Sequence, residues 1–89
     1  MRLIFDAKQL EYLNLIINIM LMSKLTPMEA KRVLKKMQYK FAGNAKVSFL
    51  NGKERGLLSG VLSHRQADLV KKNSITDEID IIQSVLDKI

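Results

Sequence analysis

The sequence predicts a mainly α protein with about four helices in a compact bundle. Apolar residues recur at helical spacing over four segments of the chain. Asp, Asn, Ser or Thr stands at the start of each segment, where the first helical N–H groups need hydrogen-bond acceptors. At 89 residues the chain can bury one hydrophobic core, so residues 1–89 are expected to form a single small helical domain.

The first helix is expected over residues 7–23, after a short strand at residues 2–5 and an N-cap at Asp6. Its apolar arc is very wide, and Asn14 and Asn18 belong to a narrow polar wedge. These two amides either face solvent or specify register in a packed interface. We expect this helix to be the central element, buried on most sides; the alternative is that part of it packs on another subunit.

The second helix has a clear start signal in Thr26-Pro27-Met28-Glu29. A threonine followed by a proline at the first helical position and a nearby glutamate is typical of a capped helix start. The helix is expected to continue to about Phe41 and to end in the turn-forming residues 42–45.

A second short strand is expected at residues 46–50, followed by Asn51 as the N-cap of a third helix that ends near Lys72. A fourth helix is expected to start near Ser74 or Thr76 and to run to the C-terminus, where isoleucines recur at helical spacing.

The two halves of the chain read alike, as strand, polar cap, long helix, turn and shorter helix. This pattern suggests a pseudo-duplication of strand–helix–helix units, in which residues 2–5 and 46–50 pair as one short two-stranded β element. An isolated two-stranded pair is marginal in water, so the helices must supply the stability. A bundle of four helices without this pairing or duplication is the alternative.

The composition argues against catalysis. The chain has no cysteine and one histidine, which excludes disulfides, thiol catalysis and multi-histidine metal sites. His64 and Asp68 lie four residues apart, but two ligands do not make a metal site, and we expect a surface pair. No phosphate-binding glycine loop and no nucleophile paired with a base is present. We therefore expect a protein that is not an enzyme, with no cofactor and no metal.

Membrane partners are not expected either. The longest apolar run, residues 15–22, is interrupted by Asn18 and is too short to span a bilayer. No signal-peptide pattern is found at the start of the sequence. The expected location is the cytoplasm, which would be that of the host cell if the chain is encoded by a phage.

A strongly basic helix face is the first candidate for function. The formal net charge is +6, and residues 26–46 carry six cations and one acid. The face has three interpretations: a solvated helix surface, a docking site for an acidic protein partner, or a site that binds nucleic-acid phosphates. Lysines outnumber arginines 11 to 4, so contacts with nucleic acid would be to the backbone rather than to bases. The candidate partner-binding residues are Lys31, Arg32, Lys35, Lys36, Tyr39 and Lys40.

The third helix carries a ridge of small side chains that includes Gly56, Gly60 and Ser63. Because glycine within a helix is unfavourable, close approach of another backbone is its usual reason. We expect this ridge to receive bulky side chains of the first helix within the same subunit; the alternative is an interface with a partner or a second copy. Arg65 projects into the leucine face of the same helix, where it must snorkel, meet a carboxylate or anchor an interface.

The segment 50–58, Leu-Asn-Gly-Lys-Glu-Arg-Gly-Leu-Leu, together with a short N-terminal strand, a capped helix and the closing pattern of residues 82–89, resembles small hypothetical proteins of phages and mobile elements of Gram-positive bacteria. The resemblance implies an inhibitor or small regulator of a host or phage macromolecule, including anti-defence roles. The predicted function is therefore a non-catalytic protein-binding module. The alternatives are a small basic nucleic-acid-associated protein and a structural homo-oligomer such as a homodimer.

Overall fold

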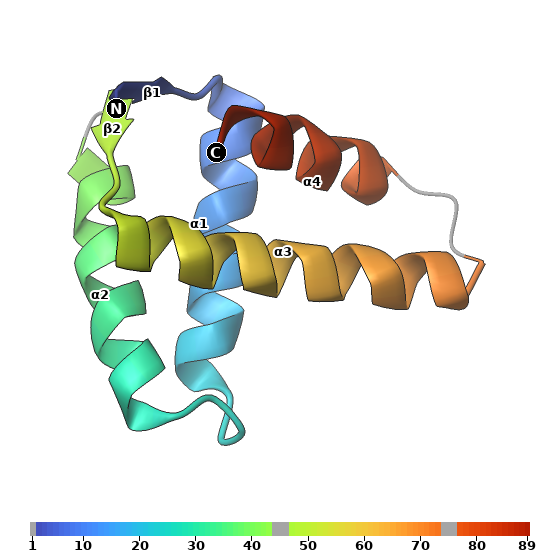
Figure 1. The fold of residues 1–89 in the computed structure, drawn as a ribbon, viewed down its shortest axis with the longest axis horizontal. Helices are drawn as coiled ribbons and strands as arrows, with labels where there is room; N and C mark the ends of the chain where they lie inside the picture. Colours follow the sequence, from blue (N-terminus) through green and yellow to red (C-terminus); the bar gives the residue numbers. More distant parts are fainter. Residues whose placement is uncertain (1, 44–46, 74–76) are drawn as a thin grey trace.

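The computed structural model describes residues 2–43, 47–73 and 77–89 and shows four helices and one short β ribbon (Figure 1). The prediction of a mainly α protein with four helices is confirmed. The elements, in chain order, are β1 (Arg2–Ile4), α1 (Ala7–Met22), α2 (Met28–Gly43), β2 (Val47–Phe49), α3 (Gly52–Lys71) and α4 (Asp77–Lys88). Lys46, Ser74 and Thr76, which entered the predicted element ends and the basic segment, lie outside the described residues.

The helices form two crossed layers. Helices α1 and α2 lie side by side as an antiparallel hairpin, and α3 crosses that hairpin at a steep angle (Figure 1). Helix α4 packs on α3 and on the N-terminal half of α1. This arrangement leaves the turn between α1 and α2 projecting away from the other two helices (Figure 1).

The two long helices α1 and α3 begin with matching capping boxes. The Asp6 carboxylate accepts a hydrogen bond from the backbone N–H of Gln9, and the Gln9 side chain accepts one from the N–H of Asp6. Asn51 and Glu54 repeat the same exchange at the start of α3. Each box satisfies two N–H groups that a helix start otherwise leaves without an acceptor.

The observed start of α2 differs from the prediction. The first backbone hydrogen bond of this helix is accepted by the Pro27 carbonyl, from the N–H of Lys31. Thr26 is buried, and its predicted exchange with Glu29 is not among the hydrogen bonds of the described residues. The capping box predicted at Thr26 therefore does not form, whereas the N-caps predicted at Asp6 and Asn51 do.

The ribbon joins the start of the chain to the segment between α2 and α3. β1 pairs antiparallel with β2, with Leu3 opposite Ser48. Phe5 and Leu50 follow the two strands directly, and both are buried. The Phe5 ring meets the Phe41 ring edge to face, with 5.8 Å between their centroids, so the end of α2 packs against the start of α1.

All four helices contribute to one core, and the fully buried large side chains come from each of them. Leu13 and Ile17 of α1 lie against residues from the other helices, in line with the apolar spacing of each segment. The largest fully buried side chains are Phe5, Leu13, Ile17, Leu34, Met37, Leu58, Leu62, Ile82 and Val85.

The expectation that α1 is buried on most sides is wrong. Leu15 and Ile19 each keep more than half of their surface exposed, although Leu13 and Ile17 are fully buried. The reason is geometric: α3 crosses the α1–α2 hairpin instead of running along it, so it covers only part of α1 (Figure 1). A wide apolar arc therefore remains open to solvent.

Candidate binding surface

The structure divides the basic face of α2 into cations that serve the fold and cations that are free to bind. Lys40 belongs to the first group: its Nζ lies 2.7 Å from Oε1 of Glu54, whose side chain is only 4% exposed. Glu54 is also the carboxylate of the α3 capping box. Lys40 thus links α2 to the start of α3, and the fold already uses its charge.

Three of the remaining cations line one side of an open groove of about 420 Å³ between α1 and α2. Lys31 and Lys35 lie four residues apart and share a helix side, and Arg32 lies next to them. Within the described part of the chain, none of the three forms an ion pair. The full lining is Leu21, Met28, Lys31, Arg32, Lys35 and Gln38.

The other two predicted residues of this face, Lys36 and Tyr39, are exposed and lie outside the groove lining. The Tyr39 side chain is 73% exposed. The structure therefore brings Lys31, Arg32 and Lys35 together, while Lys36 and Tyr39 remain on the open surface of α2 and Lys40 faces α3.

Exposed apolar side chains surround the turn between α1 and α2, next to the groove. Met22, Leu25 and Met28 are 84%, 94% and 68% exposed. Sequence reasoning did not select these residues, because Met22 extends the apolar run of the first helix and Met28 was considered only as part of a helix start. The available signal was Leu25, an apolar residue within the polar turn between two helices.

A hydrogen bond between the two helices borders the groove. The Asn18 side-chain oxygen accepts from the Gln38 amide, so this part of the predicted polar wedge joins α1 to α2. Asn14 is half-buried and lines a separate hollow of about 520 Å³ along α1, together with Tyr12 and Ile81. The wedge thus contributes both to the hairpin contact and to its outer surface.

The expectation that the glycine ridge of α3 packs closely on α1 is wrong. A Cβ atom built on Gly52, Gly56 or Gly60 would meet no other atom within 4 Å, and Ser63 is exposed. The ridge faces outward because α3 turns its leucines towards the core. Gly56 and Gly60 line an open hollow of about 450 Å³ with Met20 and His64 beside them.

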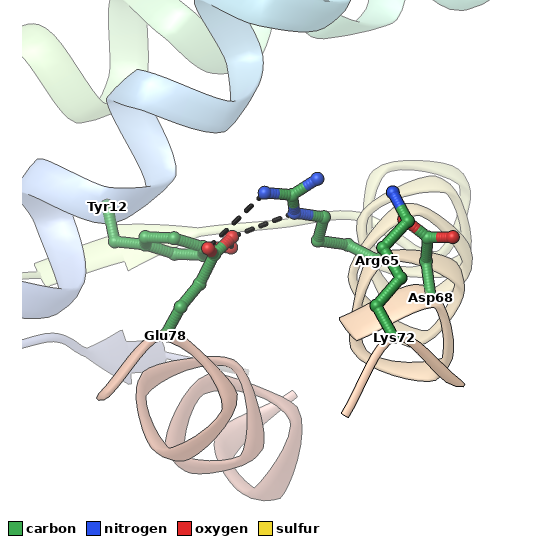
Figure 2. A network of polar contacts seen from close by, with 5 residues as sticks. All are labelled: Tyr12, Arg65, Asp68, Lys72 and Glu78. Atoms are coloured by element: carbon green, nitrogen blue, oxygen red, sulfur yellow. Dashed lines mark hydrogen bonds and ion pairs between the residues drawn. The ribbon is translucent and has the colours of Figure 1, made fainter. Parts of the chain in front are cut away.

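Arg65 pairs with a carboxylate, which is one of the three outcomes that the sequence predicted for it. Its Nε donates to Oε2 of Glu78 over 2.8 Å, and the hydroxyl of Tyr12 donates to the same oxygen over 2.6 Å (Figure 2). The three side chains come from α3, α4 and α1. Arg65 is therefore engaged within the chain, and its role as an interface anchor remains a prediction.

The electrostatics of this cluster follow from its contacts. The hydrogen bond from Arg65 holds the pKa of Glu78 below its usual value. Burial of the phenol, strengthened by its hydrogen bond to Glu78, raises the pKa of Tyr12 well above the usual range. Near neutral pH, both shifts favour a neutral Tyr12 phenol beside the charged pair of Arg65 and Glu78. The cluster therefore acts as a structural contact between three helices.

Contrary to the prediction, Asp68 does not pair with His64. The Asp68 carboxylate lies 3.2 Å from Nζ of Lys72, one helical turn further along α3 (Figure 2). Across residues 2–43, 47–73 and 77–89, no group of three or more His, Asp or Glu side chains is arranged to hold a metal ion. Among the helices described, none combines the length and the apolar character needed to cross a bilayer.

Comparison of the chain with protein-family models, with curated proteins and with solved structures finds no match. The physical features of its own surface are therefore the guide to its function.

Proposed function

We propose that this protein is a non-catalytic binding module that docks an acidic protein surface on the outer side of the α1–α2 hairpin. The observation that carries the proposal is the juxtaposition of Lys31, Arg32 and Lys35 with strongly exposed apolar side chains at the adjacent turn. Exposed apolar residues bordered by charge are typical of protein interaction sites. Such a module would regulate or inhibit its partner by occupying the partner's surface, in line with the phage-type role that the sequence resemblance implies.

A protein partner explains this surface better than nucleic acid does. A phosphate backbone attracts lysines but offers little for Met22, Leu25 and Met28 to bury. An acidic protein surface can satisfy the cations and cover the apolar side chains together. Apolar burial would then supply affinity, while the cations would supply orientation and speed of association.

The test uses capture from extracts of the producing cell, followed by mass spectrometry. The immobilised wild-type chain is compared with a Lys31→Glu/Lys35→Glu variant and with a Lys36→Glu control, each with untreated and with nuclease-treated extract. We expect one acidic protein to be retained by the wild type and the control and lost by the double variant. Its direct binding is then measured with the two purified proteins.

Two outcomes would contradict the proposal. Retention that is the same for all three baits would show that the groove cations play no part. Retention that disappears after nuclease treatment, together with binding to duplex DNA that weakens steeply with salt, would favour the nucleic-acid alternative. Light scattering of the purified chain tests the homo-oligomer alternative, because a monomer at high micromolar concentration excludes it.

A further inference from the structure

The groove between α1 and α2 has the chemistry of a receptor for one particular kind of partner segment. Leu21 and Met28 supply apolar surface, and three cations stand along the α2 side. Leu21 is half-buried and packs against the core, so this part of the floor is held in place, whereas Met28 is 68% exposed. A ligand that matches this lining must combine an apolar group with negative charge.

We propose that the groove binds an acidic segment of the partner protein, with one apolar side chain of that segment inserted between Leu21 and Met28 and with flanking carboxylates placed against Lys31, Arg32 and Lys35. This inference rests on the proposed function and specifies the partner at the same surface. Its argument is charge complementarity: the lining holds three cations and no acid. Carboxylates beside an apolar residue satisfy the cations while the apolar side chain displaces water from the floor.

The position of the cations gives the segment its register. Lys31 and Lys35 are one helical turn apart along α2, about 6 Å along the axis, so they can reach carboxylates on both sides of one inserted side chain. Arg32 adds a planar donor group that can bind a carboxylate through two hydrogen bonds. Gln38 also lines the groove and donates a hydrogen bond to Asn18, which keeps this part of the lining in a defined position.

The hollow beside Gly56 and Gly60 is a weaker candidate for this role. Its lining is Met20, Gly56, Leu57, Gly60, Val61 and His64, which carries no comparable concentration of charge. The lining of the α1–α2 groove differs in that its three cations favour a negatively charged ligand.

The test measures binding of synthetic peptides by fluorescence anisotropy. The first peptide carries one leucine flanked on both sides by glutamates, and its matched partner has serine in place of leucine at the same net charge. We expect the leucine peptide to bind the wild-type protein at least about tenfold more tightly, because burial of a leucine side chain is worth at least that factor. Met28→Ser should reduce this preference, and Lys31→Gln/Lys35→Gln should weaken both peptides.

Lys36→Gln is the matched control, since it removes the same charge from the same helix outside the groove lining. We expect it to weaken either peptide much less than Lys35→Gln does. Circular dichroism of each variant checks that the helices remain, and the choice of Met28 over Leu21 avoids the core.

Equal affinity for the two peptides, with sensitivity to Lys31 and Lys35, would overturn the apolar insertion but leave the proposed acidic partner in place. Absence of binding by both peptides would also overturn the inference, and the capture experiment would then decide separately on the proposed function. Binding to vesicles of anionic phospholipid that depends on Met28, with no preference between the peptides, would assign the groove and turn to a lipid surface instead.

Discussion

Arg65 of α3 and Glu78 of α4 form an ion pair that joins these two helices, and Tyr12 of α1 donates its hydroxyl to the same carboxylate (Figure 2). One carboxylate thus holds three helices. The Tyr12 residue is only 7% exposed, so its hydroxyl depends on Glu78 for an acceptor, whereas the Arg65 side chain is 44% exposed and can reach water. Loss of the Glu78 carboxylate should therefore cost more free energy at Tyr12 than at Arg65.

Replacement of Glu78 should separate these two contributions. Glu78→Ala leaves the part-buried Tyr12 hydroxyl without its acceptor and should lower the free energy of unfolding by about 1–3 kcal/mol. Glu78→Gln keeps an acceptor oxygen and loses the partly exposed ion pair, so its cost should be about 1 kcal/mol or less. Urea denaturation measures both. Equal costs for the two variants would show that the phenol does not depend on this carboxylate.

The same carboxylate should make stability depend on pH in the acidic range. The pKa of Glu78 is lowered in the folded protein from its ordinary value of 4.5, so the folded state favours the ionised form. Its contribution is present above that ordinary value and is lost as the pH falls through the lower folded pKa. The stability difference between wild type and Glu78→Gln should therefore shrink on acidification. In Arg65→Met, the side-chain carboxyl resonance of Glu78 should titrate at higher pH than in wild type, and an unchanged midpoint would contradict this assignment of cause.

Lys40 and Lys36 should differ in their effect on stability although both are lysines of α2. Lys40 pairs with the buried Glu54 carboxylate, and its loss leaves that charge with the Asn51 N–H as its one remaining hydrogen-bond donor among the described residues. Lys40→Met should cost about 1–2 kcal/mol, below the full value for a buried pair because the lysine side chain is partly exposed. Lys36→Met, at an exposed position, should stay within about 0.5 kcal/mol of wild type. Thermal unfolding followed by circular dichroism gives both values, and equal effects would mean that Lys40 is an ordinary surface lysine.

Gly56→Ala and Gly60→Ala should each stabilise the protein. Neither glycine has a positive φ, and an added Cβ meets open space at both positions. Alanine lowers the entropy of the unfolded chain and favours the helix, which is worth about 0.5–1 kcal/mol at each site. The measurement is the shift in the urea midpoint at low protein concentration. A loss of stability that grows with protein concentration would instead place this ridge in contact with a second copy.

The helices and most of their limits could be predicted from the sequence, because periodicity and capping are local properties. Asp6 and Asn51 were identified as N-caps, and both form full capping boxes with backbone angles that nearly coincide. The similarity of the two halves is consistent with the proposed duplication, which remains a prediction. The capping box predicted at Thr26 did not form, although the residue types match the motif. Thr26 is buried at the turn, and burial depends on the tertiary structure rather than on local sequence.

The sequence by itself determined a mainly α chain, its helix starts and the basic character of α2. Only the tertiary structure decided which cations are free, where Arg65 finds its carboxylate and that the glycine ridge is open. The physical reason is that helical spacing sets the direction of a side chain relative to its own axis, while the crossing of α3 over the α1–α2 hairpin sets what lies in that direction. Lys40 and Lys35 belong to the same helix, yet one meets Glu54 of α3 and the other meets solvent at the rim of a groove.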